Sequence, residues 1–125
     1  QALAEGGDEL IVVNFANADM VGHTGVVPAA VAAVETVDGC MAVVREAVRA
    51  AGGLLCVTAD HGNSEHMIEP DGSPNTAHTG NPVPLWIDRA GLPLRAGGSL
   101  GDIAPTLCGL MGWEPGPAMT GTPLL

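Results

Sequence analysis

The six residues Thr58-Ala59-Asp60-His61-Gly62-Asn63, which follow the apolar run Leu54-Leu55-Cys56-Val57, constrain the fold more than any other feature of the sequence. An apolar run of this length that ends in polar residues and glycine predicts a buried strand leading into a loop. In open α/β sheets, ligands bind at the loops that follow the carboxyl ends of strands. This loop begins with a carboxylate and an imidazole, and both are ligands for divalent metals. An ordinary turn is the alternative interpretation, because Asp and Gly are common turn residues.

Two more predicted strands and a long helix surround this loop. The strands are expected at residues 10–15, 54–58 and 83–87, each rich in apolar residues. Valines recur at three- and four-residue steps over residues 28–51, which predicts an amphipathic helix that ends at a pair of glycines. Strand, helix and strand in succession predict a βαβ unit with parallel strands and a right-handed crossover. The predicted fold class is therefore α/β, a sheet flanked by helices.

The two ends of the chain carry shorter helical patterns. Residues 1–5, followed by two glycines, are typical of the last turn of a helix. A domain that starts there starts in the middle of its fold, so we expect a fragment of a longer chain. Residues 102–111 predict a short helix with cap-like residues at Ser99 and Asp102 and a stop at Gly112.

Composition excludes several classes of partner. The 125 residues are 46% hydrophobic, enough for one domain with a core, and the net charge is −10 with no lysine. This balance argues against nucleic acid and against anionic membranes as partners. The three cysteines have apolar neighbours and are expected to be buried, reduced thiols of a cytoplasmic protein. We expect no membrane span, because no apolar stretch looks long enough to cross a bilayer.

Two further segments carry residue types that bind metals. Asp19 and His23 are four residues apart, a spacing that places both side chains on one helical face or on one side of a tight loop. A helix cap and a solvated histidine are the alternative interpretation. His78 lies near the end of a long polar loop, residues 63–81, which we expect to be mobile unless a metal holds His78. His66, in the same loop, has no partner at a recognisable spacing and is expected to be an ordinary surface histidine.

The three segments together predict a site for two metal ions. They supply two carboxylates and three imidazoles, each in a loop that borders a predicted strand. This donor set without cysteine suits Mn²⁺, Zn²⁺ or Fe²⁺ better than Mg²⁺. Five ligands exceed what one ion with an open position takes, and two ions about 3.5–4 Å apart are typical of phosphoryl transfer. The candidate ligands are Asp19, His23, Asp60, His61 and His78.

Three motifs also carry a resemblance to a known family. They are NFANADMVGHTG at residues 14–25, TADHGN at residues 58–63 and TAHT at residues 76–79. With them, the sequence resembles the cofactor-independent phosphoglycerate mutases of the alkaline phosphatase superfamily. The resemblance extends over essentially the whole chain. It implies an alkaline-phosphatase-like sheet, of which residues 1–125 form the C-terminal part of the metal-binding domain.

The resemblance also implies a role for each candidate ligand. Asp19, His23 and His78 would hold one manganese ion, and Asp60 and His61 would hold part of the shell of a second. Zinc, iron and cobalt are the alternative metals. The family interconverts 2- and 3-phosphoglycerate through a phosphoserine, which implies a small-molecule substrate and a place in glycolysis.

The serines of this chain depart from that pattern. Ser64, Ser73 and Ser99 match nothing in the family's nucleophile motif, so we expect no catalytic residue in this segment. The isolated fragment should therefore be inactive. It should also hold at most one ion well, because two adjacent ligands such as Asp60 and His61 usually cannot hold a second ion without help. A dimer through an exposed sheet edge is a further expectation for the fragment. Two alternatives stay open: another phosphomutase or phosphatase of the same superfamily, and a non-catalytic metal-binding domain.

Overall fold

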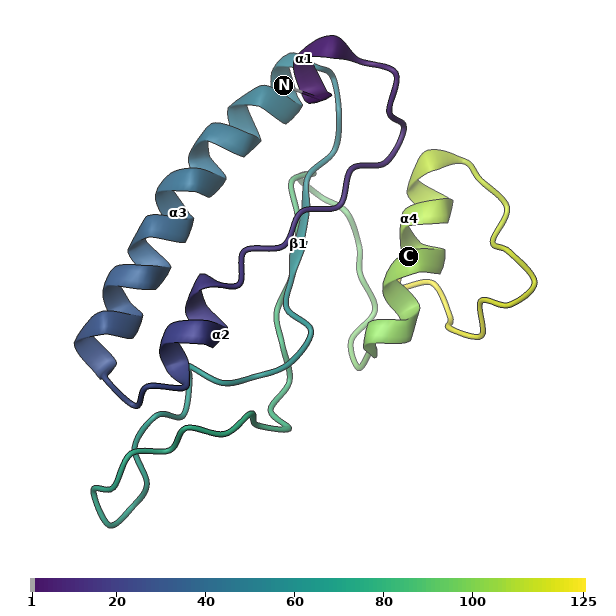
Figure 1. The fold of residues 1–125 in the computed structure, drawn as a ribbon. Coiled ribbons are helices and arrows are strands. Elements are labelled where there is room, and N and C mark those ends of the chain that lie inside the picture. Colours follow the sequence, from purple (N-terminus) through teal and green to yellow (C-terminus); the bar gives the residue numbers. More distant parts are fainter. Residues whose placement is uncertain (1) are drawn as a thin grey trace. The chain divides into compact units, whose positions relative to one another are not determined.

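In the computed structural model, which describes residues 2–125, the chain divides into two compact units (Figure 1). The first unit extends to Asp88 and the second spans Arg89–Leu125. The first contains helices α1 (Ala2–Glu5), α2 (Asn17–Gly22) and α3 (Val27–Ala50) and strands β1 (Cys56–Thr58) and β2 (Leu85–Ile87). The second contains the 3₁₀-helix η1 (Leu100–Asp102) and helix α4 (Ile103–Met111). All five candidate ligands belong to the first unit.

Helix α3 follows the predicted boundaries to within one residue at each end. Pro28 lies in its first turn, where the missing N–H costs no hydrogen bond. The helix ends just before Gly52, whose φ of 69° places it in the left-handed region that stops helices. The helix packs against α2, the element that supplies the first two candidate ligands.

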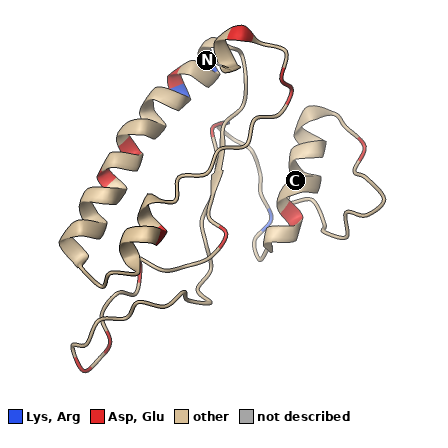
Figure 2. Cartoon of the chain, in the orientation of Figure 1, with Lys and Arg blue, Asp and Glu red and all other residues tan. Residues whose placement is uncertain are grey.

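By length and hydropathy alone, α3 could also cross a membrane, so the expectation that no stretch is long enough was wrong. One such helix is weak support for a span, because the core helices of globular proteins satisfy the same criterion. Figure 2 shows acidic residues spaced along the helix. The helix sequence includes Glu35 and Asp38. In addition, Arg45 pairs with Asp88, which follows β2. In this chain the helix therefore makes the contacts of a packing helix.

Strands β1 and β2 form a two-stranded antiparallel sheet in which Val57 faces Trp86. Strand β2 begins two residues later than the predicted strand at residues 83–87. The reason is chemical: Pro82 and Pro84 have no N–H group to donate to a ladder.

The predicted parallel βαβ unit is not formed, which corrects the expectation for this part of the fold. Residues 10–15 lie outside any helix or strand, and the single sheet among residues 2–125 is the antiparallel pair. A strand buried on both faces needs neighbours for its backbone groups and its side chains. Here Leu10, Val12 and Val13 remain 53%, 85% and 60% exposed, so residues 10–15 lack those neighbours.

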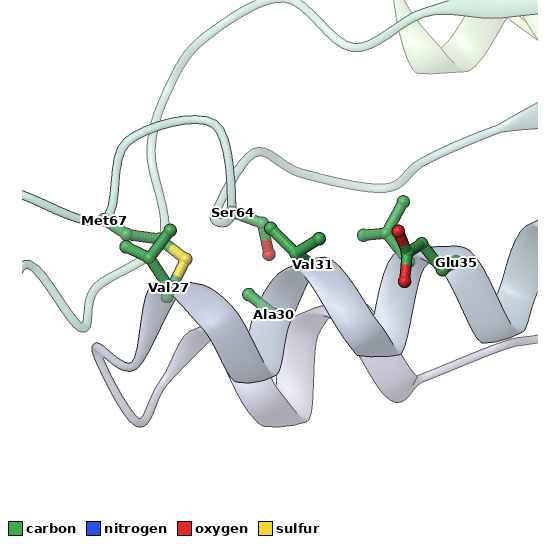
Figure 3. Close-up of a pocket in the computed structure, with 7 residues that line it drawn as sticks. Val27, Ala30, Val31, Glu35, Ser64 and Met67 are labelled. Carbon is green, nitrogen blue, oxygen red and sulfur yellow. The ribbon is translucent and has the colours of Figure 1, made fainter.

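The loop between the two strands is anchored on α3 by one apolar side chain. Met67 is buried, and together with Val27, Ala30 and Val31 it lines a hollow of about 240 Å³ (Figure 3). The backbone N–H of Asn75 donates to the carbonyl of Met67 at 2.8 Å, which closes the loop on itself. The sequence analysis overlooked this anchor. The mobility of the loop without metal stays a prediction.

The second unit is organised around the buried carboxylate of Asp102. It accepts the N–H groups of Ser99 at 2.9 Å and Thr122 at 2.8 Å, and it pairs with Arg95 at 3.1 Å. These bonds, first of all that from Ser99, lower the pKa of Asp102. The predicted helix cap at Ser99 is confirmed as a capping box, and α4 ends at Gly112 with φ 71°, as predicted.

The three cysteines differ in burial. Cys108 is buried and Cys56 is half-buried, but Cys40 on α3 is exposed. The expectation of three buried thiols was therefore wrong for Cys40. Its apolar neighbours in sequence lie on a helix of which only one face is covered in this chain, with Ala30 and Val48 as its buried residues.

Candidate metal centre

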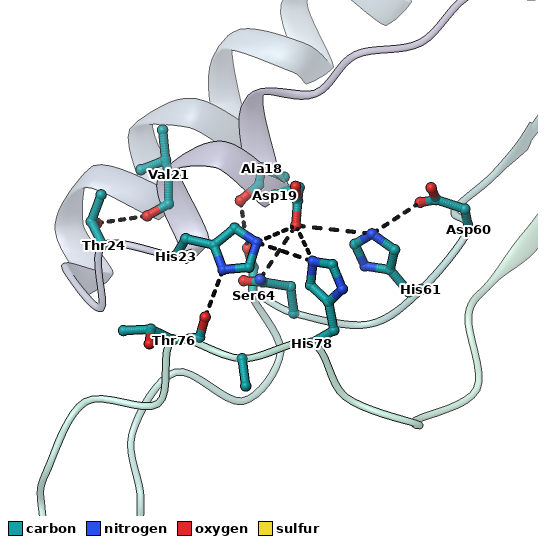
Figure 4. Close-up of polar contacts among 12 residues, drawn as sticks. Ala18, Asp19, Val21, His23, Thr24, Asp60, His61, Ser64, Thr76 and His78 are labelled. Atoms are coloured by element: carbon teal, nitrogen blue, oxygen red, sulfur yellow. Dashed lines mark hydrogen bonds and ion pairs between the residues drawn. The ribbon is translucent and has the colours of Figure 1, made fainter.

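Three segments that are distant in the sequence meet at one site in the first unit (Figure 4). Helix α2 and its C-cap supply Asp19 and His23, the loop after β1 supplies Asp60 and His61, and the loop before β2 supplies His78. The ligand atoms of Asp19, His23 and His78 all lie within 4.8 Å of one another. The structure therefore brings together the three side chains that the family resemblance assigns to one ion.

The geometry of this cluster is close to that of a metal site. Asp19 Oδ1 lies 3.1 Å from His23 Nε2 and 3.0 Å from His78 Nε2, and the two Nε2 atoms are 3.0 Å apart. Metal bonds of about 2.0–2.2 Å at tetrahedral angles separate neighbouring ligand atoms by about 3.3–3.6 Å. A small outward shift of the three side chains would therefore make room for one ion. One carboxylate and two imidazoles form a donor set that borderline divalent metals favour.

The orientation of His23 is fixed by the loop that carries His78. His23 Nδ1 lies 2.6 Å from the carbonyl oxygen of Thr76. Because a carbonyl oxygen can only accept, Nδ1 carries a proton, and in the neutral imidazole the lone pair is therefore on Nε2, the atom that lies near Asp19 and His78. Metal-binding histidines usually donate their second nitrogen in this way, which fixes both the tautomer and the ring.

Asp60 and His61 lie beside the cluster and do not complete a second one. His61 Nε2 is 3.7 Å from Asp60 Oδ1 and 4.0 Å from Asp19 Oδ1, and its ring stacks on that of His78 with centroids 3.7 Å apart. The Asp60 side chain is 88% exposed, and the buried His61 Nδ1 has no hydrogen-bond partner. Two adjacent ligands fall short of the three or four that hold an ion in known sites.

His66 stands apart from the site, as the sequence predicted for it. Its side chain is 43% exposed, and its Nε2 lies 3.6 Å from a carboxylate oxygen of Glu69. Among the residues that the structure describes, the group that could hold a metal ion contains Asp19, His23 and His78 but not His66. His66 therefore provides a natural control among the four histidines.

Asn63 is a buried contributor to the site that sequence reasoning missed. It is 6% exposed, and its Nδ2 donates to Asp19 Oδ1 at 3.4 Å. A Cβ on Gly22 would overlap the Asn63 side chain, so α2 approaches this loop at a glycine. The neighbouring Ser64 donates to the carbonyl oxygen of Ala18 at 3.0 Å. Asn63 is the last residue of the TADHGN motif, and no role was predicted for it from the sequence.

Glu65 is a second residue that the sequence did not single out. Its carboxylate accepts hydrogen bonds from the Thr79 hydroxyl, from Asn81 Nδ2 at 2.9 Å and from the N–H of Asn63 at 2.7 Å. These bonds, with Thr79 the largest contributor, lower the pKa of Glu65 to about 2. Glu65 is therefore ionised at neutral pH and connects the loop after β1 to the residue that follows His78.

Comparisons with known proteins identify the family to which this chain is related. Residues 1–115 match the Metalloenzyme superfamily. The chain is 56% identical to a 2,3-bisphosphoglycerate-independent phosphoglycerate mutase of Rhodopirellula baltica, with 98% of this chain and 23% of the relative covered. It is also 56% identical to the enzyme of the same name from Syntrophotalea carbinolica, with 100% and 25% covered. The chain thus spans about a quarter of the length of these relatives.

A solved structure shows the same fold. It is a crystal structure of a Leishmania mexicana phosphoglycerate mutase at low cobalt concentration. This chain and that protein are 34% identical in sequence, and the two structures superpose with a TM-score of 0.78. The match covers 96% of this chain and 25% of that chain. The alkaline-phosphatase-like fold expected from the sequence is therefore confirmed for this segment, with the sheet reduced to one antiparallel pair.

Proposed function

The chain belongs to the Metalloenzyme superfamily, and from that premise we propose that it is the C-terminal metal-binding segment of a cofactor-independent phosphoglycerate mutase. The observation that carries the proposal is the convergence of Asp19, His23 and His78 in a chain that aligns with mutases over nearly its whole length. The proposed activity of the complete protein is the interconversion of 2- and 3-phosphoglycerate in glycolysis, in the cytoplasm.

Each of the five residues has a proposed role in this activity. Asp19, His23 and His78 would hold one divalent ion, and Asp60 and His61 would contribute to a second that needs further ligands from elsewhere in the protein. Manganese is the proposed metal, with zinc, iron and cobalt as alternatives, because the donors are carboxylate and imidazole. Bound divalent ions would stabilise the charge on a transferring phosphoryl group and would lower the pKa of an attacking hydroxyl.

The chain's own residues prepare this site in two ways. Thr76 holds His23 in the tautomer that leaves Nε2 free to bind, and Asn63 donates to the carboxylate of Asp19. The nucleophilic serine and the residues that recognise the substrate's phosphate and carboxylate would lie in the remaining three quarters of the protein. The 125 residues alone would then bind metal without turning over substrate.

An activity assay on the complete protein tests this function. With Mn²⁺ and no added bisphosphoglycerate, it should convert 3-phosphoglycerate into 2-phosphoglycerate. His23→Ala should abolish the conversion and His66→Ala should preserve it. Efficient hydrolysis of phosphate esters without mutase activity would instead identify another enzyme of the superfamily. Metal binding without any turnover would identify a non-catalytic domain, and turnover by the 125 residues alone would reveal a nucleophile within them.

A further inference from the structure

Glu65 joins the two parts of the loop between β1 and β2 that carry His61 and His78, although it belongs to neither candidate ligand group. One carboxylate oxygen accepts the N–H of Asn63 at 2.7 Å, in the part of the loop that carries His61. The other oxygen accepts the hydroxyl of Thr79, directly after His78, and Asn81 Nδ2 at 2.9 Å. The carboxylate thus has partners on both sides of the site.

The backbone holds the same two parts of the loop together at the same point. The N–H of Thr79 donates to the carbonyl oxygen of Gly62 at 2.8 Å, and these two residues form an isolated antiparallel bridge. A Cβ at Gly62 would overlap both the Thr79 hydroxyl and a Glu65 carboxylate oxygen. The absence of a side chain at Gly62 therefore allows Glu65 to reach across the bridge.

The two histidines whose rings stack directly precede the two residues of this bridge. His61 directly precedes Gly62, and His78 directly precedes Thr79. Their ring centroids are 3.7 Å apart, and His78 Nε2 is 3.0 Å from Asp19 Oδ1. A change in the bridge would move His78 relative to both His61 and Asp19, because no residue intervenes to absorb it.

We propose that Glu65 is a positioning residue for the metal centre, which fixes His78 against His61 and Asp19 by holding Thr79 to the loop after β1. The inference rests on the proposed role of these side chains as metal ligands. Hydrogen-bonded partners behind metal ligands typically change metal affinity by about 10–100-fold when they are removed. Glu65→Gln keeps the size of the side chain but leaves one acceptor oxygen for the Asn63 N–H, the Thr79 hydroxyl and Asn81 Nδ2, which two carboxylate oxygens accept in the wild type.

A neighbouring carboxylate provides a matched control. Glu69 lies in the same loop, accepts Asn75 Nδ2 at 2.6 Å and pairs with His66 at 3.6 Å. Within the described part of the chain, it bonds to no candidate ligand and to no residue directly beside one. Glu69→Gln keeps an oxygen that can accept Asn75 Nδ2, so it reports on the loss of a carboxylate charge from this loop, whereas Glu65→Gln also removes an acceptor next to His78.

The test measures Mn²⁺ affinity by calorimetric titration of the 125-residue chain and its variants, with circular dichroism melts of the metal-free proteins. Glu65→Gln and Thr79→Ala should each weaken Mn²⁺ binding by about ten-fold or more. Thr79→Ser, which keeps the hydroxyl, should bind like the wild type, and Glu69→Gln should bind within about two-fold of it. Wild-type affinity in a folded Glu65→Gln, or an equal loss in Glu69→Gln, would overturn the proposal.

A second readout needs no metal and separates this inference from the proposed function. Nuclear Overhauser contacts between the ring protons of His61 and His78 should be present in the metal-free wild type and in Glu69→Gln. They should be lost in Glu65→Gln and Thr79→Ala. If the wild type binds no Mn²⁺, the proposed metal site fails, while the ring contacts still show whether Glu65 positions His78. Ring contacts that persist in both variants would contradict the role of Glu65.

Discussion

At the scale of single residues, one oxygen atom organises the site. Asp19 Oδ1 lies within 3.4 Å of His23, His78 and Asn63 side-chain nitrogens and 4.0 Å from His61 Nε2. Three of these partners come from segments more than 40 positions away in the sequence. The position of α2 relative to the loop after β1 therefore controls the site.

Gly22 is the residue that permits this approach, so its substitution is a sensitive test. Gly22→Ala places a methyl group on the side chain of Asn63 and should destabilise the chain by about 1–3 kcal/mol. Gly39→Ala is the matched control in α3, where a Cβ meets open space, and should stabilise by about 0.5–1 kcal/mol. Urea denaturation of both variants measures the two free energies of unfolding. A neutral Gly22→Ala would show that α2 does not pack this closely in solution.

The sequence predicted the metal-ligand candidates but not the residues that hold them in place by hydrogen bonds. Carboxylate and imidazole can be read from residue type, so Asp19, His23 and His78 were identifiable before their distances were known. Asn63 and Glu65 were not identifiable, because the chemistry of an amide or carboxylate in a loop becomes informative only when its partner is known. That partner is Asp19 for one and Thr79 for the other.

At the scale of elements, α3 is tied to the end of β2 by a single carboxylate. Asp88 accepts two bonds each from Arg45 and Arg49, at 2.9–3.2 Å, and Arg45 also lies over the ring of Trp86. The bonds from Arg45 first, and then those from Arg49, lower the pKa of Asp88 to about 2. The Asp88 side chain is only 12% exposed, which limits competition from water.

This ion-pair network predicts how stability depends on pH. Because the pKa of Asp88 is lower in the folded chain than its unfolded value of about 3.9, its stabilising contribution is present above pH about 4. It is lost as the pH falls from about 4 toward about 2. Asp88→Asn should therefore melt at a lower temperature than wild type at pH 7, and the difference should shrink over that range.

Glu46→Gln is the control for that measurement. Glu46 is 77% exposed and makes one long ion pair with Arg49, at 3.9 Å, so its removal should change the melting temperature little. A difference between wild type and Asp88→Asn that stays constant from pH 7 to pH 2 would contradict the assignment.

Elements differ in how far the sequence determines them. Helix α3 was predictable because its signals, a valine repeat, an early proline and a terminal glycine pair, are local. Strand pairing was not predictable, because the apolar run at residues 10–15 specifies a buried strand without specifying its neighbours. The antiparallel partner of β1 lies 27 positions further on, after the loop that carries His78.

At the scale of the whole molecule, exposed apolar residues mark where this chain should contact more protein. Leu10, Val12 and Val13 are more than half exposed, and the chain spans about a quarter of its curated relatives. Under the proposed function, the rest of the mutase would supply the neighbours of residues 10–15.

In the isolated chain, the same exposed apolar side chains should promote self-association. Sedimentation velocity across a concentration series should show dimers or larger species, and Val12→Lys together with Val13→Glu should reduce them. A monomer at every concentration would count against an interface at this segment.

The central claim is that Asp19, His23 and His78 form a divalent metal centre, and calorimetric titration with Mn²⁺ tests it most directly. The 125-residue chain should bind one equivalent well, because the second pair of ligands is incomplete. His23→Ala and His78→Ala should remove that binding, His66→Ala should retain it, and affinity should fall in acid, because metal ligands must be deprotonated. Two tight equivalents, or a loss in His66→Ala equal to that in His78→Ala, would contradict the account.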